Sequence, residues 1–519
     1  MPHKIDLVLH NANIITMDSE LPRAESMVIS NERIIAIGTT GELQPFFKQA
    51  MEVIDGQGRT VLPGFIDTHT HLAGLGRRLL HIDFGKTRSS DEALQLIKEK
   101  VVESPPRKLV LGYNWDETNW ETPIYLTKQD LDPISPDNPV VMIRVCGHLA
   151  SLNSIALARL EIDADHPGVD RDSKTGRLTG VLRDYPLDIR KLESQEEDLQ
   201  QTLISACQYA NSVGITSVHE NLSYQQLPYI AQYIKLHQKK LLTVRVYTNL
   251  ETEFLEQLAG LELPSGLGDE YFRLGGVKVF ADGSLGAQTA ALSQPYNDDP
   301  ETDGRLLFTE ADYEFLIRKA NELGLQVNTH AIGDRGIDFV LQVQEKHNNA
   351  KFIKQLRHTI IHAEFLTATL IARVKKLNIL LLQQPNFAHR WGLPDSMYDW
   401  RLGPNRARQL NNFRRVLDAG IKVAFGSDCM PMDPLYGIYS AVTHPNSAIR
   451  ISVEEAIRLY TADAAFASFE EQVKGSLSLG KLADFIVLSA NPFEIPPEEL
   501  RNLRILETYL GGNRVYSRL

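Results

Sequence analysis

The sequence predicts an α/β fold: a TIM-like (β/α)8 barrel with a small β-sandwich domain built from both termini and an α/β insertion after the first barrel strand. Three patterns in the 519 residues predict it. Short apolar strands alternate with helical stretches along the middle of the chain, both chain ends carry β-type sequence, and one gap between barrel strands is far too long for a loop. We expect the β-sandwich at 1–60 and 466–519, the barrel at 61–465, and an inserted subdomain at 72–213.

Composition and charge restrict the class of protein. Hydrophobic residues make up 43% and charged residues 23% of the chain, which is typical of a globular protein with a large core. The net charge of -12 argues against nucleic acid as a partner, and no apolar run reaches membrane-spanning length. The first residues lack the apolar core of a signal peptide, and the 3 cysteines are far apart, so a reducing cytoplasm is expected. The expected partner is a small-molecule substrate, with no nucleic acid and no membrane, and assembly into a homodimer stays open.

The two ends of the chain carry matching β-type sequence. Residues 5–9, 26–30 and 33–37 form short bursts of alternating apolar and polar residues, and residues 485–488 and 504–509 form similar runs near the C-terminus. Neither set has enough strands to close a good core alone. Because chain termini commonly lie close together, we expect the two sets to pair into one β-domain.

The sequence pattern in the middle of the chain predicts alternating strands and helices. Helix-period segments lie between most of the strand candidates, for example at 309–323 and 366–377. Parallel strands with crossover helices predict a barrel whose chemistry lies at the C-terminal ends of its strands. The eight strand candidates are 61–71, 214–220, 243–249, 274–281, 325–331, 358–363, 378–384 and 422–428.

The long gap between the first two barrel strands is expected to fold by itself. It contains strand candidates of its own at 108–112 and 140–143. We interpret residues 72–213 as a subdomain over the barrel mouth, because both of its connections flank the expected site. Trp115 and His148 are the expected substrate-binding residues of this subdomain, although its aromatic residues could equally fill its own core.

Two histidines follow the first barrel strand. Phe65 and Ile66 form a short apolar strand that continues into His69 and His71, and alternation places both imidazoles on the same face. Two surface histidines in a loop are the alternative. Neutral imidazole is a preferred ligand of zinc and its neighbours, so the pair predicts one divalent metal ion.

Other strand ends carry ionisable groups of the same kinds. A single histidine is more often a hydrogen-bonded structural residue than a ligand. A ring of such groups at one end of one barrel is not readily produced by chance or packing. The strand ends contribute His69, His71, His219, Lys278, Asp282, His330, His362, Glu364 and Asp428.

Lys278 is the unusual member because it lies inside an apolar strand. An ammonium group there costs a large desolvation energy unless it is neutral or paired. A lysine that extends its amine to water, or an ion pair with Asp282, would be a structural explanation. The functional explanation is an uncharged amine modified by CO2 to a carbamate, an anionic ligand that can bridge two metal ions.

Two further residues near the predicted site are ambiguous. His219 ends the second strand and could contact substrate, or could equally be a hydrogen-bonded wall residue. Cys429 follows Asp428 directly, and strand alternation turns its thiol to the opposite face, so packing is the favoured role.

The motifs along the chain resemble the amidohydrolase superfamily. The resemblance is strongest to the branch that includes N-substituted formamide deformylases and related uncharacterised metal-dependent hydrolases, and it spans nearly the whole chain. The chain departs from the branch pattern at Tyr113, Asn114 and Glu364, which leaves the substrate open. The matching segments are Pro63 to His71, Val277 to Ser284, Thr329 to Arg335, Ile361 to Ala363, Gly426 to Asp428 and Gly475 to Asp484.

The resemblance implies a ligand set and a mechanism. One or two divalent ions, most readily zinc, would activate a water, with Asp428 as the proton acceptor. Polarisation of the substrate carbonyl by a metal, with His219 or His148, would assist. The strand-four lysine of binuclear members implies a carboxylated Lys278. The implied metal ligands are His69, His71, Lys278, His330, His362 and Asp428.

Three functions are compatible with these residues. The first is a metal-dependent amidohydrolase that cleaves a C–N bond, other than a peptide bond, in an amide, formamide or cyclic amide. The second is a deaminase or a lactone or ester hydrolase of the same superfamily. The third is a non-catalytic scaffold, which the complete ligand set disfavours because a scaffold has no need for buried ionisable groups.

Overall fold

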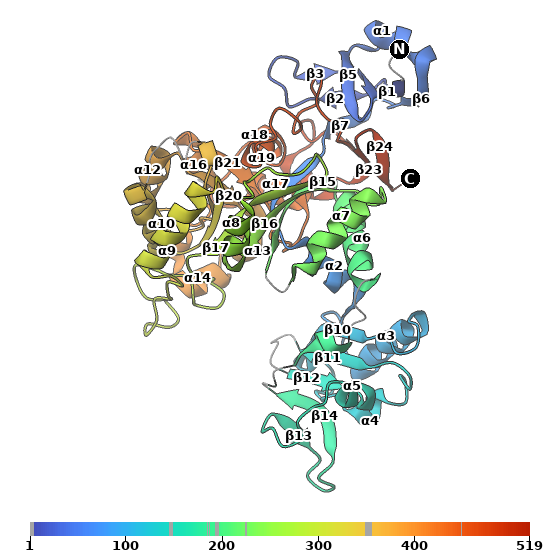
Figure 1. Cartoon of the computed structure of the whole chain (residues 1–519), viewed down its shortest axis with the longest axis vertical. Helices are drawn as coiled ribbons and strands as arrows, with labels where there is room; N and C mark the ends of the chain where they lie inside the picture. The colour runs from blue at the N-terminus through green and yellow to red at the C-terminus, as the bar shows by residue number, and fades with distance from the viewer. Residues whose placement is uncertain are drawn as a thin grey trace. The chain divides into compact units, whose positions relative to one another are not determined.

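The computed structural model describes residues 5–144, 149–183, 185, 187–192, 197–223, 226–347, 355–447 and 449–518. The chain forms two compact units, one from Met1–Leu72 with Cys207–Leu519 and one from Ala73–Ala206. The elements of each are labelled in Figure 1. None of the described helices is long and apolar enough to cross a membrane.

The larger unit contains a nearly closed barrel of eight parallel strands, which confirms the predicted barrel. Strands that follow one another along the chain are neighbours in the sheet. Between the last and the first strand, Thr68 Oγ1 donates to the Phe425 carbonyl at 2.9 Å and the Asp428 N–H donates to the His69 carbonyl at 2.8 Å. The strands are β8 (Phe65–Thr70), β15 (Ile215–Leu222), β16 (Arg245–Glu251), β17 (Phe272–Phe280), β18 (Val327–Ala331), β19 (Thr359–His362), β20 (Leu380–Gln383) and β21 (Val423–Phe425).

The first predicted strand, 61–71, is wrong as a single strand. Residues Thr60–Pro63 form β7, which pairs with β22 (Phe485–Leu488) in a terminal sheet, and only Phe65–Thr70 belong to the barrel. Gly64 separates the two. A Cβ at Gly64 would lie 2.3 Å from Thr216 Oγ1, so glycine is required where the chain passes from one sheet to the other.

Amphipathic helices follow most of the barrel strands. The helix α9 (Glu310–Glu322) begins after Thr309, whose side chain accepts the Asp312 N–H, and buries one apolar face. Together with α10 (Asp334–His347) and α12 (Ala368–Leu377) it lies outside the strands (Figure 1). Both helices predicted at 309–323 and 366–377 are therefore confirmed. Further helices are α6 (Glu197–Ser212), α7 (Pro228–Gln238), α8 (Leu255–Leu261), α13 (Pro385–Trp391), α14 (Met397–Leu402), α15 (Pro404–Ala407), α16 (Phe413–Asp418), α17 (Pro434–Thr443), α18 (Val453–Leu459) and α19 (Ala462–Ala467).

Strands from both chain ends share one six-stranded sheet, and this sheet shares a core with a four-stranded sheet from the N-terminal end. The four-stranded sheet has the order β5-β4-β1-β6, and the six-stranded sheet has the order β24-β23-β22-β7-β2-β3. Leu7, Met27, Phe485 and Tyr509 pack in the common core. The remaining strands are β1 (Ile5–His10), β2 (Asn13–Ile15), β3 (Arg23–Ala24), β4 (Ser26–Ser30), β5 (Arg33–Gly38), β6 (Ala50–Asp55), β23 (Ile505–Leu510) and β24 (Asn513–Ser517).

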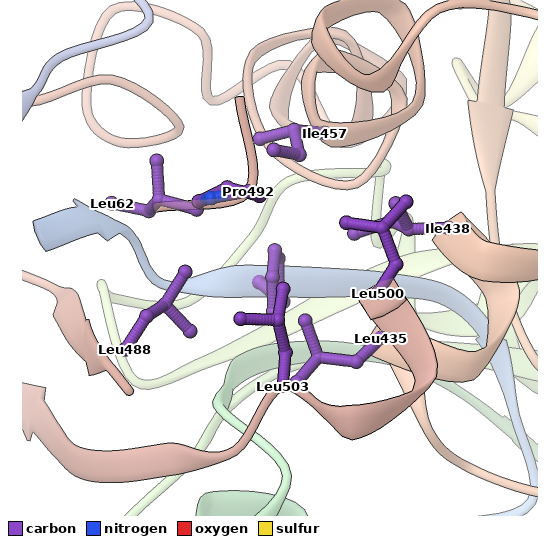
Figure 2. A pocket seen from close by; sticks show the side chains of 9 residues that line it. Leu62, Leu435, Ile438, Ile457, Leu488, Pro492, Leu500 and Leu503 are labelled. Atoms are coloured by element: carbon purple, nitrogen blue, oxygen red, sulfur yellow. The ribbon is translucent and has the colours of Figure 1, made fainter. Parts of the chain in front are cut away.

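An apolar seam joins the C-terminal region to the helices beside the barrel. Figure 2 shows its side chains converging from β7, β22, α17, α18 and the segment around the 3₁₀ helix Pro497–Asn502. The volume in the seam that could hold water is about 0 Å³, so it is packed rather than a ligand site. The labelled lining residues are Leu62, Leu435, Ile438, Ile457, Leu488, Pro492, Leu500 and Leu503.

The smaller unit is an α/β layer of its own. Val110 and Val140 face one core and Leu111 and Val141 the other, as strand alternation requires. Both strands predicted inside the insertion are present, as β10 and β11. The sheet order is β13-β14-β12-β11-β10-β9. The elements are α2 (Leu72–Leu80), β9 (Ile82–Asp83), α3 (Ser90–Glu103), β10 (Val110–Trp115), α4 (Lys128–Leu131), β11 (Val140–Arg144), β12 (Leu149–Leu152), α5 (Ser154–Arg159), β13 (Val169–Arg171) and β14 (Leu178–Arg183).

Candidate metal centre

Two histidines and one aspartate meet where the barrel closes. His69 and His71 lie at the end of β8, and Asp428 lies three residues after β21. Asp428 Oδ1 is 3.5 Å from Nε2 of His69 and 3.4 Å from Nε2 of His71. The ligand atoms of these three residues all lie within 4.8 Å of one another. Two imidazoles and a carboxylate so close together can hold one divalent cation.

Two more histidines extend this cluster across the barrel. The ring of His362, on β19, lies 5.1 Å from the ring of His69 and 4.5 Å from the ring of His330 on β18. Burial lowers the pKa of His330 to about 3 and the pKa values of His69 and His362 well below their usual value. The three imidazoles are therefore neutral at pH 7, which is the protonation state that binds metal.

Lys278 lies inside the barrel with its amine buried. The residue is 1% exposed, and Nζ has no hydrogen-bond partner among the described residues. Burial lowers the pKa of the amine to about 7, against the opposing effect of the Asp428 and Glu251 carboxylates. The lysine charge in turn lowers the pKa values of His69, His330 and His362, so Lys278 lies within electrostatic reach of the cluster.

The two structural explanations of Lys278, an amine that extends to water and an ion pair with Asp282, do not fit its surroundings. Its amine does not reach water, and the Asp282 carboxylate accepts the backbone N–H groups of Ala291, Ile332 and Gly333 at 2.9, 3.0 and 2.9 Å. Lys278 Nζ lies 4.8 Å from the centre of the Phe280 ring, but a buried amine without a hydrogen-bond partner is still costly, and an anionic modification would remove that cost. The donors of this centre thus fit a divalent metal ion.

The peptide backbone at two candidate ligand positions is held in the left-handed region. His362 has φ 71° and Asp428 has φ 54°. Such conformations are costly for non-glycine residues and persist where the surroundings fix them. The Asp428 N–H donates to the His69 carbonyl at 2.8 Å, and beside it the Asp67 carboxylate accepts the N–H groups of Ser427 and His69 at 2.8 and 3.2 Å.

Asp282 has a role that the sequence analysis missed. Its carboxylate joins the segment after β17 to the segment after β18, and Oδ1 lies 3.7 Å from Nε2 of His330. Burial raises its pKa to about 7, although the N–H groups of Gly333, Ile332 and Ala291 oppose this. The sequence marks Asp282 only as an ionisable group near a strand end, and the glycine of the second segment is a further local signal. A Cβ at Gly333 would lie 1.9 Å from the Ala291 carbonyl oxygen, so the backbone there must come close to the neighbouring segment.

His219 does not lie at the end of its strand, so that prediction is wrong. The strand β15 continues to Leu222, which places His219 farther from the mouth. Its ring lies 5.1 Å from that of Tyr247, and burial lowers its pKa to about 3. Its role toward substrate stays a prediction. Asn221, two residues later on the same face, is the residue that contacts His69, at 2.9 Å from Nδ1.

Cys429 is buried, and its sulfur accepts the His71 N–H at 3.3 Å. Strand alternation does not set the orientation of Cys429, contrary to the prediction, because β21 ends at Phe425. Burial raises the pKa of the thiol well above its usual value. These contacts are those of a packed thiol.

The two expected substrate-binding residues belong to the smaller unit. Trp115 is 1% exposed, stacks on Trp120 at 5.9 Å between ring centres and packs in that unit's core. His148 lies outside the described residues. The place of Trp115 in a pocket wall, and the covering of the barrel mouth by residues 72–213, stay predictions.

Comparisons with known proteins agree with this geometry. The model of the amidohydrolase family matches residues 52–516. The chain is 34% identical to the putative amidohydrolase YtcJ of Bacillus subtilis over 98% of this chain and 99% of that protein. It is 28% identical to the N-substituted formamide deformylase of Arthrobacter pascens over 99% and 98% of the two chains. An uncharacterized metal-dependent hydrolase from Pyrococcus furiosus superposes with a TM-score of 0.79 at 29% identity, over 94% of this chain and 100% of that one.

Proposed function

This chain belongs to the amidohydrolase family, and on that premise we propose that it hydrolyses the C–N bond of an amide, formamide or cyclic amide with a metal-activated water. The products are an amine and a carboxylic acid. The observation that carries the proposal is the approach of His69, His71 and Asp428 within 4.8 Å, at the barrel end where such enzymes carry out their chemistry. The similarity to an N-substituted formamide deformylase supports the substrate class.

The proposed metal ligands come from six positions on five strand ends. When bound, one or two divalent ions, most suitably zinc, acidify water to a pKa of about 7 and polarise a carbonyl. Neutral rings at His69, His330 and His362 are ready to bind without releasing a proton. The proposed ligands are His69, His71, Lys278, His330, His362 and Asp428.

Asp428 is the proposed general base. Its carboxylate accepts a proton from the attacking water and later returns it to the leaving nitrogen, which departs as a neutral amine. The Asp428 N–H is held by the His69 carbonyl at 2.8 Å, so the carboxylate keeps its position beside the two imidazoles during the proton transfer. A fixed base of this kind costs no reorganisation at the moment of reaction.

Lys278 is proposed to carry a carbamate. The lone pair of its neutral amine attacks the carbon of CO2, an N–C bond forms while one C–O π bond breaks and its electron pair moves to oxygen, and the nitrogen loses one proton to solvent. The burial of the amine and its pKa of about 7 support this reaction, because a substantial fraction is unprotonated at neutral pH. The resulting anion would offer two oxygen atoms beside the imidazoles.

The test of this function is amine release across a set of small amides. Purified protein is assayed with N-formyl, N-acyl and cyclic amides, beside esters, lactones and ring amidines of matched size. We expect turnover of at least one amide, lost on treatment with a chelator and lost in the Asp428→Asn variant. Turnover confined to esters, lactones or ring amidines would reject the amide assignment while keeping the family.

A further inference from the structure

The end of the strand β8 is held from both sides by side chains of the neighbouring segments of the barrel. On one side, Glu220 of β15 lies opposite Thr70 in the strand register, and its carboxylate accepts the Leu72 N–H. On the other side, the sulfur of Cys429, which follows β21, accepts the His71 N–H at 3.3 Å. Two consecutive backbone N–H groups are therefore satisfied by side chains at the point where the strand ends.

Glu220 is a buried carboxylate on the outer face of the barrel wall. The next residue, Asn221, faces the ring of His69, so strand alternation turns Glu220 to the other face, where helices cover the strand. The residue is 0% exposed. Burial, and to a smaller extent the Glu220 charge, raises the pKa values of Cys207 on α6 and Tyr233 on α7. Parallel strands are usually apolar on such a face, and a carboxylate there needs hydrogen-bond donors, of which the Leu72 N–H is one.

The same carboxylate oxygen contacts residues on both sides of His71. Glu220 Oε2, which accepts the Leu72 N–H, also lies 3.0 Å from the hydroxyl oxygen of Thr70. That hydroxyl is in addition 3.1 Å from the His219 carbonyl oxygen. Leu72 is the first residue of α2, where backbone N–H groups have no partner within the helix and favour an acidic side chain. The backbone before and after position 71 is thus held by one side chain.

His71 depends on its backbone more than the other histidines of the centre do. Its side chain is 38% exposed, against 1% for His69 and 12% for His330. Packing therefore encloses the ring of His71 least. Nε2 of His71 lies 3.4 Å from Asp428 Oδ1, so the position of the backbone decides whether the ring reaches that carboxylate.

We propose that Glu220 is the positioning residue for His71, and that by holding the backbone on both sides it keeps the imidazole beside Asp428 and strengthens metal binding. The inference rests on the proposed metal-dependent function. Glutamine can take the same role, because its amide oxygen accepts an N–H group from the same place along the side chain. Leucine has no acceptor and would leave the buried Leu72 N–H without this partner.

The experiment is a zinc titration of chelator-treated protein against a chromophoric competitor. Glu220→Leu should bind zinc about 10–100-fold more weakly than the parent, the usual effect of losing a residue that supports a metal ligand. Glu220→Gln should stay within a few-fold of the parent, a rescue that the negative charge alone would not give. Should Glu220→Leu fail to fold, Glu220→Met, which keeps the unbranched shape of glutamate, takes its place.

The matched control is Glu507→Leu. Glu507 is also a buried carboxylate, 8% exposed, but it lies on β23 in the terminal sheet and accepts the Tyr509 hydroxyl at 2.8 Å. Its replacement removes a buried acid without touching the end of β8, so this variant should bind zinc like the parent. A zinc affinity that falls as far in Glu507→Leu as in Glu220→Leu would show a general loss of structure and would overturn the proposal.

Equal zinc affinity of Glu220→Leu and the parent would also overturn it, as would a loss in Glu220→Gln as large as that in Glu220→Leu. Failure of the parent itself to bind zinc would reject the proposed function instead. Amide hydrogen exchange of the metal-free proteins then decides, read by mass spectrometry on peptides that cover residues 69–74. Faster exchange in Glu220→Leu than in Glu220→Gln and Glu507→Leu supports positioning, whereas equal exchange in all three contradicts it.

Discussion

At the scale of single residues, the backbone around Asp428 sets its place in the candidate metal centre. Asp428 lies beyond its strand with φ 54°, and its carboxylate approaches two imidazoles at 3.4 and 3.5 Å. That geometry depends on Asp67, whose carboxylate accepts N–H groups from Ser427 and His69. The backbone at Asp428 is thus held against its own preference, which is common at functional sites.

The first prediction concerns Asp428. Asp428→Asn keeps the size of the side chain but cannot accept the proton of water, so kcat should fall about 10²–10⁴-fold. The measurement is steady-state amine release, with the zinc content of the same preparation as the control for binding. A kcat within a few-fold of the parent, at equal zinc content, would rule out the base role.

The second prediction concerns Lys278 and pH. Below a pKa of about 7 the amine is protonated and cannot attack CO2, and above it the neutral amine predominates. Carbamate formation should therefore rise as pH increases from about 6 to about 8.5. It is measured as a protein 13C carbonyl signal after exposure to 13C-bicarbonate, and Lys278→Ala should lack that signal. A parent protein without the signal at the upper end of this pH range would favour a centre with an unmodified lysine.

The candidate metal ligands could be named from sequence because each is a histidine, lysine or aspartate at or near the end of an apolar run. The residues that contact these side chains could not be predicted in the same way. Asn221 reads as an ordinary polar residue until the strand register places it 2.9 Å from His69, and nothing local in the sequence gives that register. Trp115, which was expected to bind substrate, packs in the core of its own unit, and its role toward substrate stays a prediction.

At the scale of elements, the segments after β17 and β18 are held by one carboxylate. Asp282 accepts three backbone N–H groups and lies 3.7 Å from His330. The barrel strands were predictable because buried parallel strands are continuous apolar runs. The break at Gly64 was not, because apolar residues continue on both sides of it and the boundary depends on the contact with Thr216.

The third prediction tests this carboxylate. Asp282→Leu leaves three buried N–H groups without partners, so the free energy of unfolding should fall by about 2–5 kcal/mol. Zinc content should fall with it, because His330 loses its support. The control is Asp303→Asn, whose pair with Arg335 is at the surface and should change stability by at most about 1 kcal/mol. Equal denaturation midpoints for the two variants would contradict the role of Asp282.

At the scale of the whole larger unit, a buried ion pair connects the barrel to the terminal sheets. Arg245 on β16 donates to both carboxylate oxygens of Asp484, at 2.7 and 2.9 Å, and the two side chains are 1% and 5% exposed. Asp484 also accepts the Gly511 N–H at 2.8 Å. These contacts give Asp484, the last residue of the Gly475–Asp484 motif, a structural role. The motif was recognisable in the sequence, but its partner, 239 residues away, was not.

The fourth prediction follows from that pair. Arg245→Met leaves the Asp484 carboxylate buried without its cation, so the free energy of unfolding should fall by about 3–5 kcal/mol. Lys346→Met is the matched control, since its pair with Glu310 is half-exposed and should matter little. Chemical denaturation of both variants is the measurement. A loss for Arg245→Met no larger than that of the control would show that the pair does not hold the sheets to the barrel.

The central claim is that His69, His71 and their neighbours bind a metal that hydrolysis of an amide requires. It is tested most directly by adding zinc in steps to chelator-treated protein while amine release and bound zinc are measured together. Activity should return in proportion to bound zinc and reach its full value at one or two ions per chain. The double variant His69→Ala, His71→Ala should neither bind that zinc nor release amine. Full amide hydrolysis by the chelated parent, or by the double variant, would contradict the claim.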